Sequence, residues 1–242
     1  MDNDREIIEY YDELFPISIE QKEFYKRQIE TYKKPVKILR IFCGTGSFEH
    51  YLAKEGCDVT GLETSQNLLE SANRKRRTQL MAVRYFNMNY LEMSHFLGKK
   101  FYNVISILDG KIIQIHDKTL LAKFFYDCKQ LLSDEGKLII ALPNFAKKIN
   151  SKEILIPIRE GFRAKLKSKI FVKDEKHMLT ADIETSNEKF FSIAKEKKVY
   201  LLTANEIQEL ANKAGFRKCK FYEDFNMSEY TENSEELIAV IS

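Results

Sequence analysis

The chain has 242 residues, 44% of them hydrophobic and 31% charged, which is enough to bury one core and typical of a single globular domain. Its net charge of +3, from 39 basic and 36 acidic residues, provides no overall field that would attract nucleic acid. No apolar run approaches the roughly 20 residues of a membrane-spanning helix, and residues 1–5 are too polar and acidic for a signal peptide. We therefore expect one cytoplasmic domain over 1–242, with no membrane partner.

The cysteines are scattered along the chain, without a Cys-x-x-Cys pair or nearby histidines; they are Cys43, Cys57, Cys128 and Cys219. Such a pattern is typical of reduced core thiols in an intracellular protein. A metal site needs several ligands at short spacing, so we expect none in this chain.

Residues 1–34 are expected to form an N-terminal helical cap. From residue 36 to residue 143, short apolar runs alternate with amphipathic stretches of helical length. The expected strands are 36–42, 58–62, 82–86, 102–107 and 137–142, and the expected helices run from 47 to about 56, from 65 onward and from 120 to 132. Alternating strands and helices predict a parallel sheet with right-handed crossovers and helices on both faces.

Residues 154–200 show a period of two instead, as in 163–170. This pattern predicts an antiparallel insertion with one face in solvent. Insertions after the fifth strand lie over the carboxyl edge of the sheet, so we expect a lid or a dimer contact, in a monomer or a homodimer. Lys165, Lys167 and Lys169 would project to one face of this insertion. They would either attract an anionic substrate or RNA, or keep a solvated strand face soluble.

The alternating pattern resumes after the insertion. Thr203 and Glu206 have the spacing of a capping box, in which each side chain accepts a hydrogen bond from the other residue's amide. The helix that they open should stop at Gly215, and two closing strands should follow near 218–222 and 237–241.

A glycine turn ends the first expected strand, where 44–46, Gly-Thr-Gly, would let a ligand lie against bare backbone. Glu63 closes the second strand 17 residues after Gly46, near the spacing of roughly 20 for a carboxylate that accepts hydrogen bonds from both ribose hydroxyls. Together these features indicate an adenosine site. A dinucleotide-binding turn needs a third small residue, and the charged Glu49 at that position disfavours a nicotinamide cofactor.

These residues resemble the class I S-adenosylmethionine-dependent methyltransferase family, whose first motif is commonly written apolar-Leu-Asp-apolar-Gly-Cys-Gly-Thr-Gly. Residues 43–46 match its second half, 61–65 look like its second motif, and 87–91 lie where the family contacts the adenine. The resemblance implies a Rossmann-like α/β fold with a seven-stranded sheet, mostly parallel with an antiparallel last strand. It implies S-adenosyl-L-methionine as cofactor, bound by Tyr11, Arg40, Cys43, Gly44, Thr45, Gly46, Glu63, Thr64, Asn89, Tyr90 and Leu108.

The sequence departs from this family at the first motif. Arg40 stands where the family has an acid near the amino group of the bound methionine portion. Two like charges about 4 Å apart repel by about 4 kcal/mol at an effective dielectric of about 20. In a working site Arg40 must therefore pair with a protein carboxylate or reach the methionine carboxylate, and Arg40→Asp is then expected to keep or improve affinity. Phe42 replaces a glycine, and Asn89 replaces an acid but can still hydrogen-bond an adenine edge.

Methyl transfer from a sulfonium depends on alignment more than on acid–base groups, which agrees with the lack of a strong catalytic motif. Segment 106–110 would lie beside the sulfonium, and it lacks the Pro-Pro-aromatic signature of the family's amino-methylating nucleic-acid enzymes. No Pro-Cys pair for cytosine-C5 chemistry is present either. The sequence thus predicts a methyltransferase that acts on an O or N atom of a small molecule, without nucleic acid.

Two residues are candidates for orienting or deprotonating the substrate. Asp109 is the first, with a turn residue before Gly110 as the other interpretation. His116 is the second, with a polar residue at the start of the next helix as its other interpretation. Two other functions stay open: a methyltransferase acting on RNA or protein, and a non-catalytic methyltransferase-like binding module, for which Arg40 is the main argument.

Overall fold

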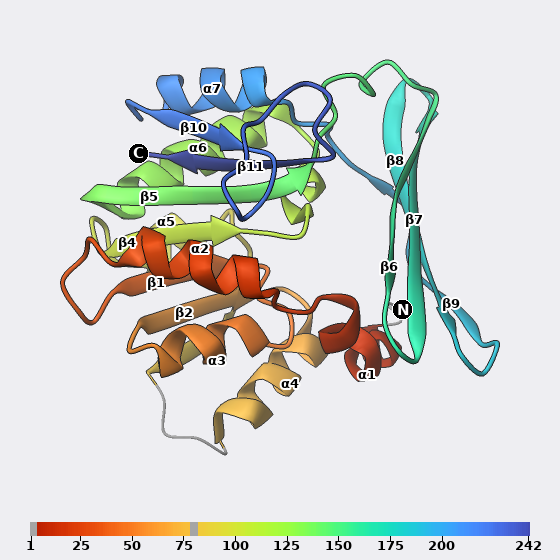
Figure 1. The fold of residues 1–242 in the computed structure, drawn as a ribbon, viewed down its shortest axis with the longest axis horizontal. Helices are drawn as coiled ribbons and strands as arrows, with labels where there is room; N and C mark the ends of the chain where they lie inside the picture. The colour runs from red at the N-terminus through yellow and green to blue at the C-terminus, as the bar shows by residue number, and fades with distance from the viewer. Residues whose placement is uncertain (1–3, 78–81) are drawn as a thin grey trace.

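The computed structural model describes residues 4–77 and 82–242. Its centre is a seven-stranded sheet in the order β10-β11-β5-β4-β1-β2-β3 (Figure 1). The five strands from β5 to β3 in this order are parallel, and β11 runs antiparallel to both of its neighbours. The predicted Rossmann-like sheet with an antiparallel last strand is therefore confirmed. The strands are β1 (Lys37–Ile41), β2 (Asp58–Glu63), β3 (Val83–Asn87), β4 (Tyr102–Ile107), β5 (Leu132–Pro143), β10 (Cys219–Tyr222) and β11 (Glu236–Ile241).

Helices cover both faces of this sheet, and each face has its own set of buried apolar side chains. One face packs against α5 (Met93–Phe96), α6 (Lys118–Leu131) and α7 (Ala204–Lys213). The other packs against α2 (Ile19–Ile29), α3 (Ser47–Lys54) and α4 (Gln66–Arg77). Within the described ranges, no helix is long and apolar enough to cross a membrane.

Most predicted boundaries agree with the structure to within a few residues, and the fifth strand is the exception. Thr203 and Glu206 form the predicted capping box at the start of α7. Strand β5 begins at Leu132, not near 137, because Tyr102 of β4 pairs with Leu132 before the register shifts. The intervening 133–136, Ser-Asp-Glu-Gly, have no period of two, so the sequence did not indicate a strand there.

A second, four-stranded antiparallel sheet is inserted between β5 and α7, as predicted. It stands across the carboxyl ends of the parallel strands (Figure 1). Helix α1 (Asp4–Leu14) packs its buried side chains, among them Tyr11, against the inner face of this sheet. The strands are β6 (Glu153–Glu160), β7 (Ala164–Lys173), β8 (Lys176–Thr185) and β9 (Phe190–Lys198).

Candidate cofactor and substrate site

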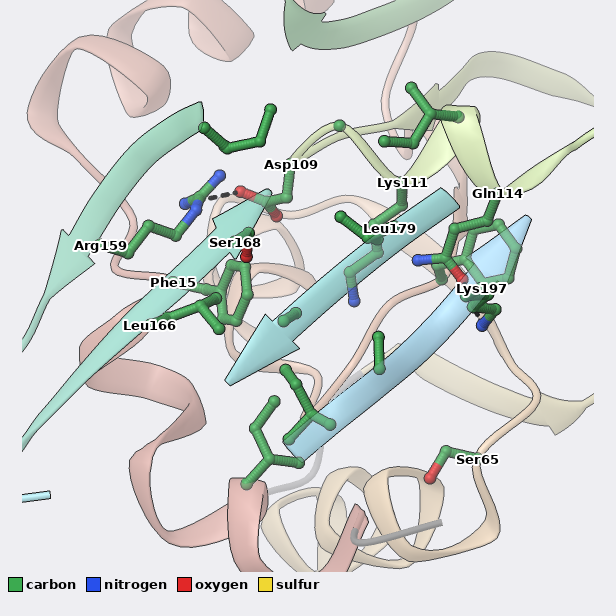
Figure 2. Close-up of a pocket in the computed structure, with 18 of the residues that line it drawn as sticks. Phe15, Ser65, Asp109, Lys111, Gln114, Arg159, Leu166, Ser168, Leu179 and Lys197 are labelled. Atoms are coloured by element: carbon green, nitrogen blue, oxygen red, sulfur yellow. Dashed lines mark hydrogen bonds and ion pairs between the residues drawn. The ribbon is translucent and has the colours of Figure 1, made fainter. Parts of the chain in front are cut away.

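A cavity of about 910 Å³ lies between the carboxyl ends of the parallel strands and the inner face of the four-stranded sheet (Figure 2). Residues that follow β1, β2 and β4 form its floor, β6 to β9 form its roof, and α1 closes one side. Large concave pockets with few polar groups are the usual ligand sites of such folds. About half of the lining is apolar, and the charged side chains on it are Glu63, Asp109, Lys111, Arg159, Lys195 and Lys197.

The turn after β1 is held in a conformation that requires glycine at two positions. Gly44 and Gly46 have φ angles of 62° and 77°, which glycine adopts without strain. A Cβ atom on Gly44 would lie 2.2 Å from Tyr11 Oη, and one on Gly46 would lie 2.3 Å from Tyr85 Oη. Phe42, just before the turn, also has a positive φ of 57°, a strained conformation for a bulky residue, and its side chain lines the cavity.

Glu63 ends β2 with its carboxylate held by backbone amides. Its Oε2 accepts a hydrogen bond from Gly44 N at 2.9 Å, and its Oε1 accepts from Thr64 N at 2.8 Å and Ser65 N at 3.0 Å. An ionised carboxylate has about four acceptor positions, so Glu63 can still accept from a ligand hydroxyl. The glycine turn and Glu63, which the sequence relates only by spacing, are thus in direct contact beside the cavity.

Arg40 points away from the cavity, toward the face of the sheet that α3 covers. Its Nε donates to Glu49 Oε1 at 3.0 Å, and its Nη1 donates to Ser106 O at 3.4 Å. Both members of the pair are buried, with 4% of Arg40 and none of Glu49 exposed. Of the two arrangements predicted for a working site, the structure has the one in which Arg40 pairs with a protein carboxylate.

Lys111 begins the short 3-10 helix η1 (Lys111–Gln114) and reaches into the cavity (Figure 2). Its Nζ donates to Tyr11 Oη at 2.6 Å. Burial raises the pKa of Tyr11 to about 12, against the opposing effect of Lys111. Burial also lowers the pKa of Lys111, but Tyr11 and the nearby Glu63 outweigh it and the net pKa is raised. Lys111 is therefore an ammonium group that contacts a neutral phenol.

Asp109 and Arg159 face each other across the cavity, from the end of β4 and from β6 (Figure 2). Asp109 Oδ1 and Arg159 Nη1 are 3.4 Å apart, and about a third of each side chain is exposed. Asp109 has a positive φ of 58°, an uncommon conformation that is often found at functional sites. Arg159 also lies over the ring of Phe15, with Cζ 4.7 Å from the centroid. The pair links the inserted sheet to the parallel sheet.

The structure brings four of the predicted site residues to the wall of the cavity: Tyr11, Glu63, Thr64 and Asp109. A smaller recess of about 30 Å³ shares Tyr11 and Asp109 with the cavity and is also bordered by Arg40, Cys43 and Thr45. The turn glycines Gly44 and Gly46 lie beneath Tyr11 and Tyr85.

Four further predicted residues line neither the cavity nor the smaller recess. His116 is exposed and lies outside the lining residues. Asn89 is also exposed, and its Oδ1 accepts from Leu91 N at 3.0 Å. Tyr90 and Leu108 are buried in the core, and Tyr90 packs against Phe42 with ring centroids 6.1 Å apart.

Sequence reasoning missed Lys111 and Arg159. A lysine directly before the apolar Ile112 and Ile113 could have indicated a charge near the core, because lysine is seldom buried without a role. Arg159 had no such signal, because its contact with Asp109 joins two segments 50 residues apart in different sheets.

The lysine row of the insertion faces away from the cavity. Leu166 and Ser168 line the cavity, so the alternating Lys165, Lys167 and Lys169 lie on the outer face of β7. Each of these lysines forms an ion pair with a glutamate, in turn Glu160, Glu184 and Glu153. The row therefore does not add positive charge beside the ligand site.

Residues 38–136 match a family model described as a methyltransferase domain. A protein named as a methyltransferase from Geobacillus sp. (strain WCH70) is 27% identical over 120 residues, which cover 49% of this chain and 47% of that protein. The match thus spans about half the length of this relative.

Several solved structures share the fold over almost the whole chain. The CcbJ methyltransferase from Streptomyces caelestis has a TM-score of 0.80 at 17% identity, covering 97% of this chain and 95% of that one. The SAM-bound amino pentose methyltransferase CalS10 from Micromonospora echinaspora has a TM-score of 0.68 at 14% identity, covering 97% and 96%. The sugar N-methyltransferase KedS8 from Streptoalloteichus has a TM-score of 0.66 at 17% identity, covering 96% and 91%.

Proposed function

We propose that the chain is a class I S-adenosylmethionine-dependent methyltransferase, as its match to a methyltransferase-domain model over residues 38–136 supports, and that it transfers a methyl group from S-adenosyl-L-methionine to an O or N atom of a small molecule. The observation that carries this proposal is the large cavity whose lining includes Glu63, beside the glycine turn, and Asp109. Cofactor and substrate can therefore meet in one space.

The residues present fit this cofactor. Tyr11 and Tyr85 lie directly over Gly44 and Gly46, so a ligand would reach the backbone of the turn only after Tyr11 shifts, and Glu63 keeps acceptor capacity at the carboxyl end of β2. The cavity of about 910 Å³ is near the upper end of the roughly 300–1,000 Å³ range of ligand pockets. That size leaves room for a substrate beside the cofactor.

Within this fit, we propose that the adenosine lies across the carboxyl ends of β1, β2 and β3, with Glu63 on the ribose hydroxyls and Thr64 beside it. Tyr11 would close over the ligand from α1. Tyr90 packs against Phe42, so Tyr90 could contact the adenine only if Phe42 moved aside.

When bound, the cofactor supplies a methyl group on a sulfonium that needs no further activation. The chain's own residues must align the acceptor and take up its proton. The residues of the cavity would hold the acceptor atom in line with the methyl group, so that the bond formed to carbon would replace the bond broken to sulfur, which would keep the electron pair. The acceptor's proton passes to the Asp109 carboxylate, which faces the cavity, and from there to water.

Two observations favour a small molecule over RNA or protein as substrate. The inserted sheet roofs the cavity, so a macromolecule would need this sheet to move, and we propose that residues 154–200 act as a lid. The lysine row that could attract RNA lies on the outer face and is paired with glutamates. The amino pentose and sugar substrates in the names of CalS10 and KedS8 support the same class.

The Arg40–Glu49 pair weakens the argument for a non-catalytic binding module. That argument needs an unpaired guanidinium beside the cofactor's ammonium, and Arg40 has a carboxylate partner at 3.0 Å. Calorimetric titration of S-adenosylmethionine and S-adenosylhomocysteine into the full chain tests the proposal. We expect saturable binding of both. If neither ligand binds at millimolar concentration, the methyltransferase activity proposed for this chain is wrong.

A further inference from the structure

Two cations on different walls of the cavity lie over the same aromatic ring. Lys111 Nζ is 5.6 Å from the centroid of Phe15, and Arg159 Cζ is 4.7 Å from it. Lys111 comes from η1, next to the parallel sheet, and Arg159 comes from β6 of the inserted sheet. Both side chains therefore lie near Phe15 in the cavity, one beside each sheet (Figure 2).

Among the described residues, neither of these two cations makes a short hydrogen bond to a carboxylate. Lys111 Nζ contacts the phenol oxygen of Tyr11, which is neutral, at 2.6 Å. The carboxyl of Glu236 lies near enough for the Arg159 charge to lower its pKa, against the larger effect of burial. Among the residues that the structure describes, Arg159 has one ion pair, at 3.4 Å to Asp109, longer than a usual charge-assisted hydrogen bond. A guanidinium can donate two parallel hydrogen bonds to one carboxylate or phosphate, so this contact leaves most of its donors available to a ligand.

The other charges of the cavity do not balance these cations. Glu63 acts on Lys111 through space, while its own oxygens accept hydrogen bonds from backbone amides. Lys195 and Lys197 of β9 add positive charge to the lining. A bound sulfonium would add another positive charge, so a neutral substrate would leave a net positive charge in a cavity whose lining is about half apolar, which is unfavourable.

We infer that the substrate carries an anionic group, a carboxylate or a phosphate, and that Arg159 and Lys111 bind it. The inference rests on the proposed methyl transfer, because it assumes that the cofactor takes the space beside Glu63 and leaves the Phe15 region to the substrate. Binding of the anion would draw Arg159 from Asp109. The Asp109 carboxylate would then be available for the acceptor's proton.

The test uses the full chain saturated with S-adenosylhomocysteine and three ring compounds of similar shape: benzoate, phenyl phosphate and the neutral benzamide. Their binding is measured by calorimetry to the wild type, Arg159→Gln, Lys111→Gln and Arg159→Lys. Lys167→Gln is the matched control, because it removes one positive charge from the outer face of the same sheet. Thermal unfolding checks that each variant is folded.

We expect the anions to bind the wild type and Lys167→Gln equally, and benzamide to bind neither. Arg159→Gln and Lys111→Gln should each weaken anion binding by about ten- to a hundredfold, the loss typical of one charged hydrogen-bond partner. Arg159→Lys should restore part of it. Tighter binding of phenyl phosphate indicates a phosphate on the substrate, and tighter binding of benzoate indicates a carboxylate.

Three results would overturn the inference while the proposed function stands. The wild type, loaded with S-adenosylhomocysteine, binds neither anion at millimolar concentration; benzamide binds as tightly as benzoate; or both glutamine variants bind the anions as the wild type does. If S-adenosylhomocysteine itself does not bind, the proposed function fails, and this inference fails with it.

Discussion

Arg40 of β1 and Glu49 of α3 form a buried ion pair, with 3.0 Å between Arg40 Nε and Glu49 Oε1. Each of these residues, considered alone, departs from the residue type expected at its position. Arg40 stands where related proteins have an acid, and Glu49 stands where a dinucleotide-binding turn has a small residue. In the structure they are partners, so the charge of the guanidinium is offset inside the protein and not by the ligand.

We predict that Glu49→Gln strongly destabilises the fold. It would leave Arg40 buried without an anionic partner, and breaking a buried pair from one side typically costs about 3–5 kcal/mol. The free energy of unfolding in urea measures this loss. Arg40→Asp should be destabilising for the same reason, because it places a second carboxylate beside Glu49. The expectation that this change keeps or improves cofactor affinity stays a prediction, which calorimetry on the folded variant would test.

A double variant and an exposed pair serve as controls for this prediction. Arg40→Met with Glu49→Leu removes both charges and should recover most of the lost stability. Lys100→Gln breaks the exposed pair with Asp134, at 3.1 Å, and should change stability by less than about 1 kcal/mol. Equal effects of Glu49→Gln and Lys100→Gln would contradict the importance of the buried pair.

The sequence predicted the main sheet and the insertion because both have strong hydrophobic periods. It also predicted which segments carry the ligand turn, since Gly44, Gly46 and Glu63 follow directly from strand ends. Partners across sheets could not be predicted this way. The contact of Asp109 with Arg159 depends on how the inserted sheet folds over the parallel one, and no local pattern encodes that arrangement.

The adenine side of the site illustrates a second limit. The resemblance implied contacts from Asn89 and Tyr90, by position in the motif alone. In the structure Phe42, which has a positive φ, packs against Tyr90. The side-chain oxygen of Asn89 accepts a hydrogen bond from Leu91 N within the same turn. A motif position specifies where the backbone lies, whereas the direction of a side chain depends on neighbours from other segments.

We predict that Glu63→Ala weakens binding of S-adenosylmethionine, measured by calorimetry. Three backbone amides already donate to Glu63, so its remaining acceptor position takes one ribose hydroxyl, and that hydrogen bond to a charged group should contribute about 1.5–3 kcal/mol. Glu63→Gln should lie between the wild type and Glu63→Ala, because an amide oxygen still accepts one hydroxyl. Glu135→Gln, at an exposed position, is the control and should bind as the wild type does. Unchanged affinity of a folded Glu63→Ala protein would show that the ribose lies elsewhere.

Asp12 should make stability depend on pH in acid. Burial raises the pKa of this carboxyl, but hydrogen bonds from Lys75, Thr45 and Ser47 outweigh it, and the net pKa is lowered from 3.8. When the pKa of a carboxyl is lower in the folded protein than in the unfolded chain, the carboxyl stabilises the fold at any pH above its pKa in the unfolded chain. This contribution is lost as the pH falls through the pKa of the folded protein.

Asp12→Asn should therefore be less stable than the wild type at neutral pH, by less than about 1 kcal/mol because half of the Asp12 side chain is exposed. The difference should shrink as urea unfolding is repeated in buffers below the ordinary carboxyl pKa. A difference that grows in acid would mean that the Asp12 carboxyl is destabilising, contrary to the contacts it makes with the glycine turn and α4.

The last prediction separates Asp109 from His116 as proton acceptors. Asp109 faces the cavity and His116 does not. Asp109→Asn should therefore lower kcat by about 10²–10⁴-fold and leave cofactor affinity unchanged. His116→Asn should have a kcat near that of the wild type. Since Asp109→Asn also frees Arg159, Arg159→Gln is measured beside it and should raise KM more than it lowers kcat. An Asp109→Asn enzyme with wild-type kcat would mean that water or another group takes the proton. Loss of kcat in His116→Asn alone would require the 3-10 turn before His116 to rearrange on substrate binding, since the histidine would otherwise remain outside the cavity.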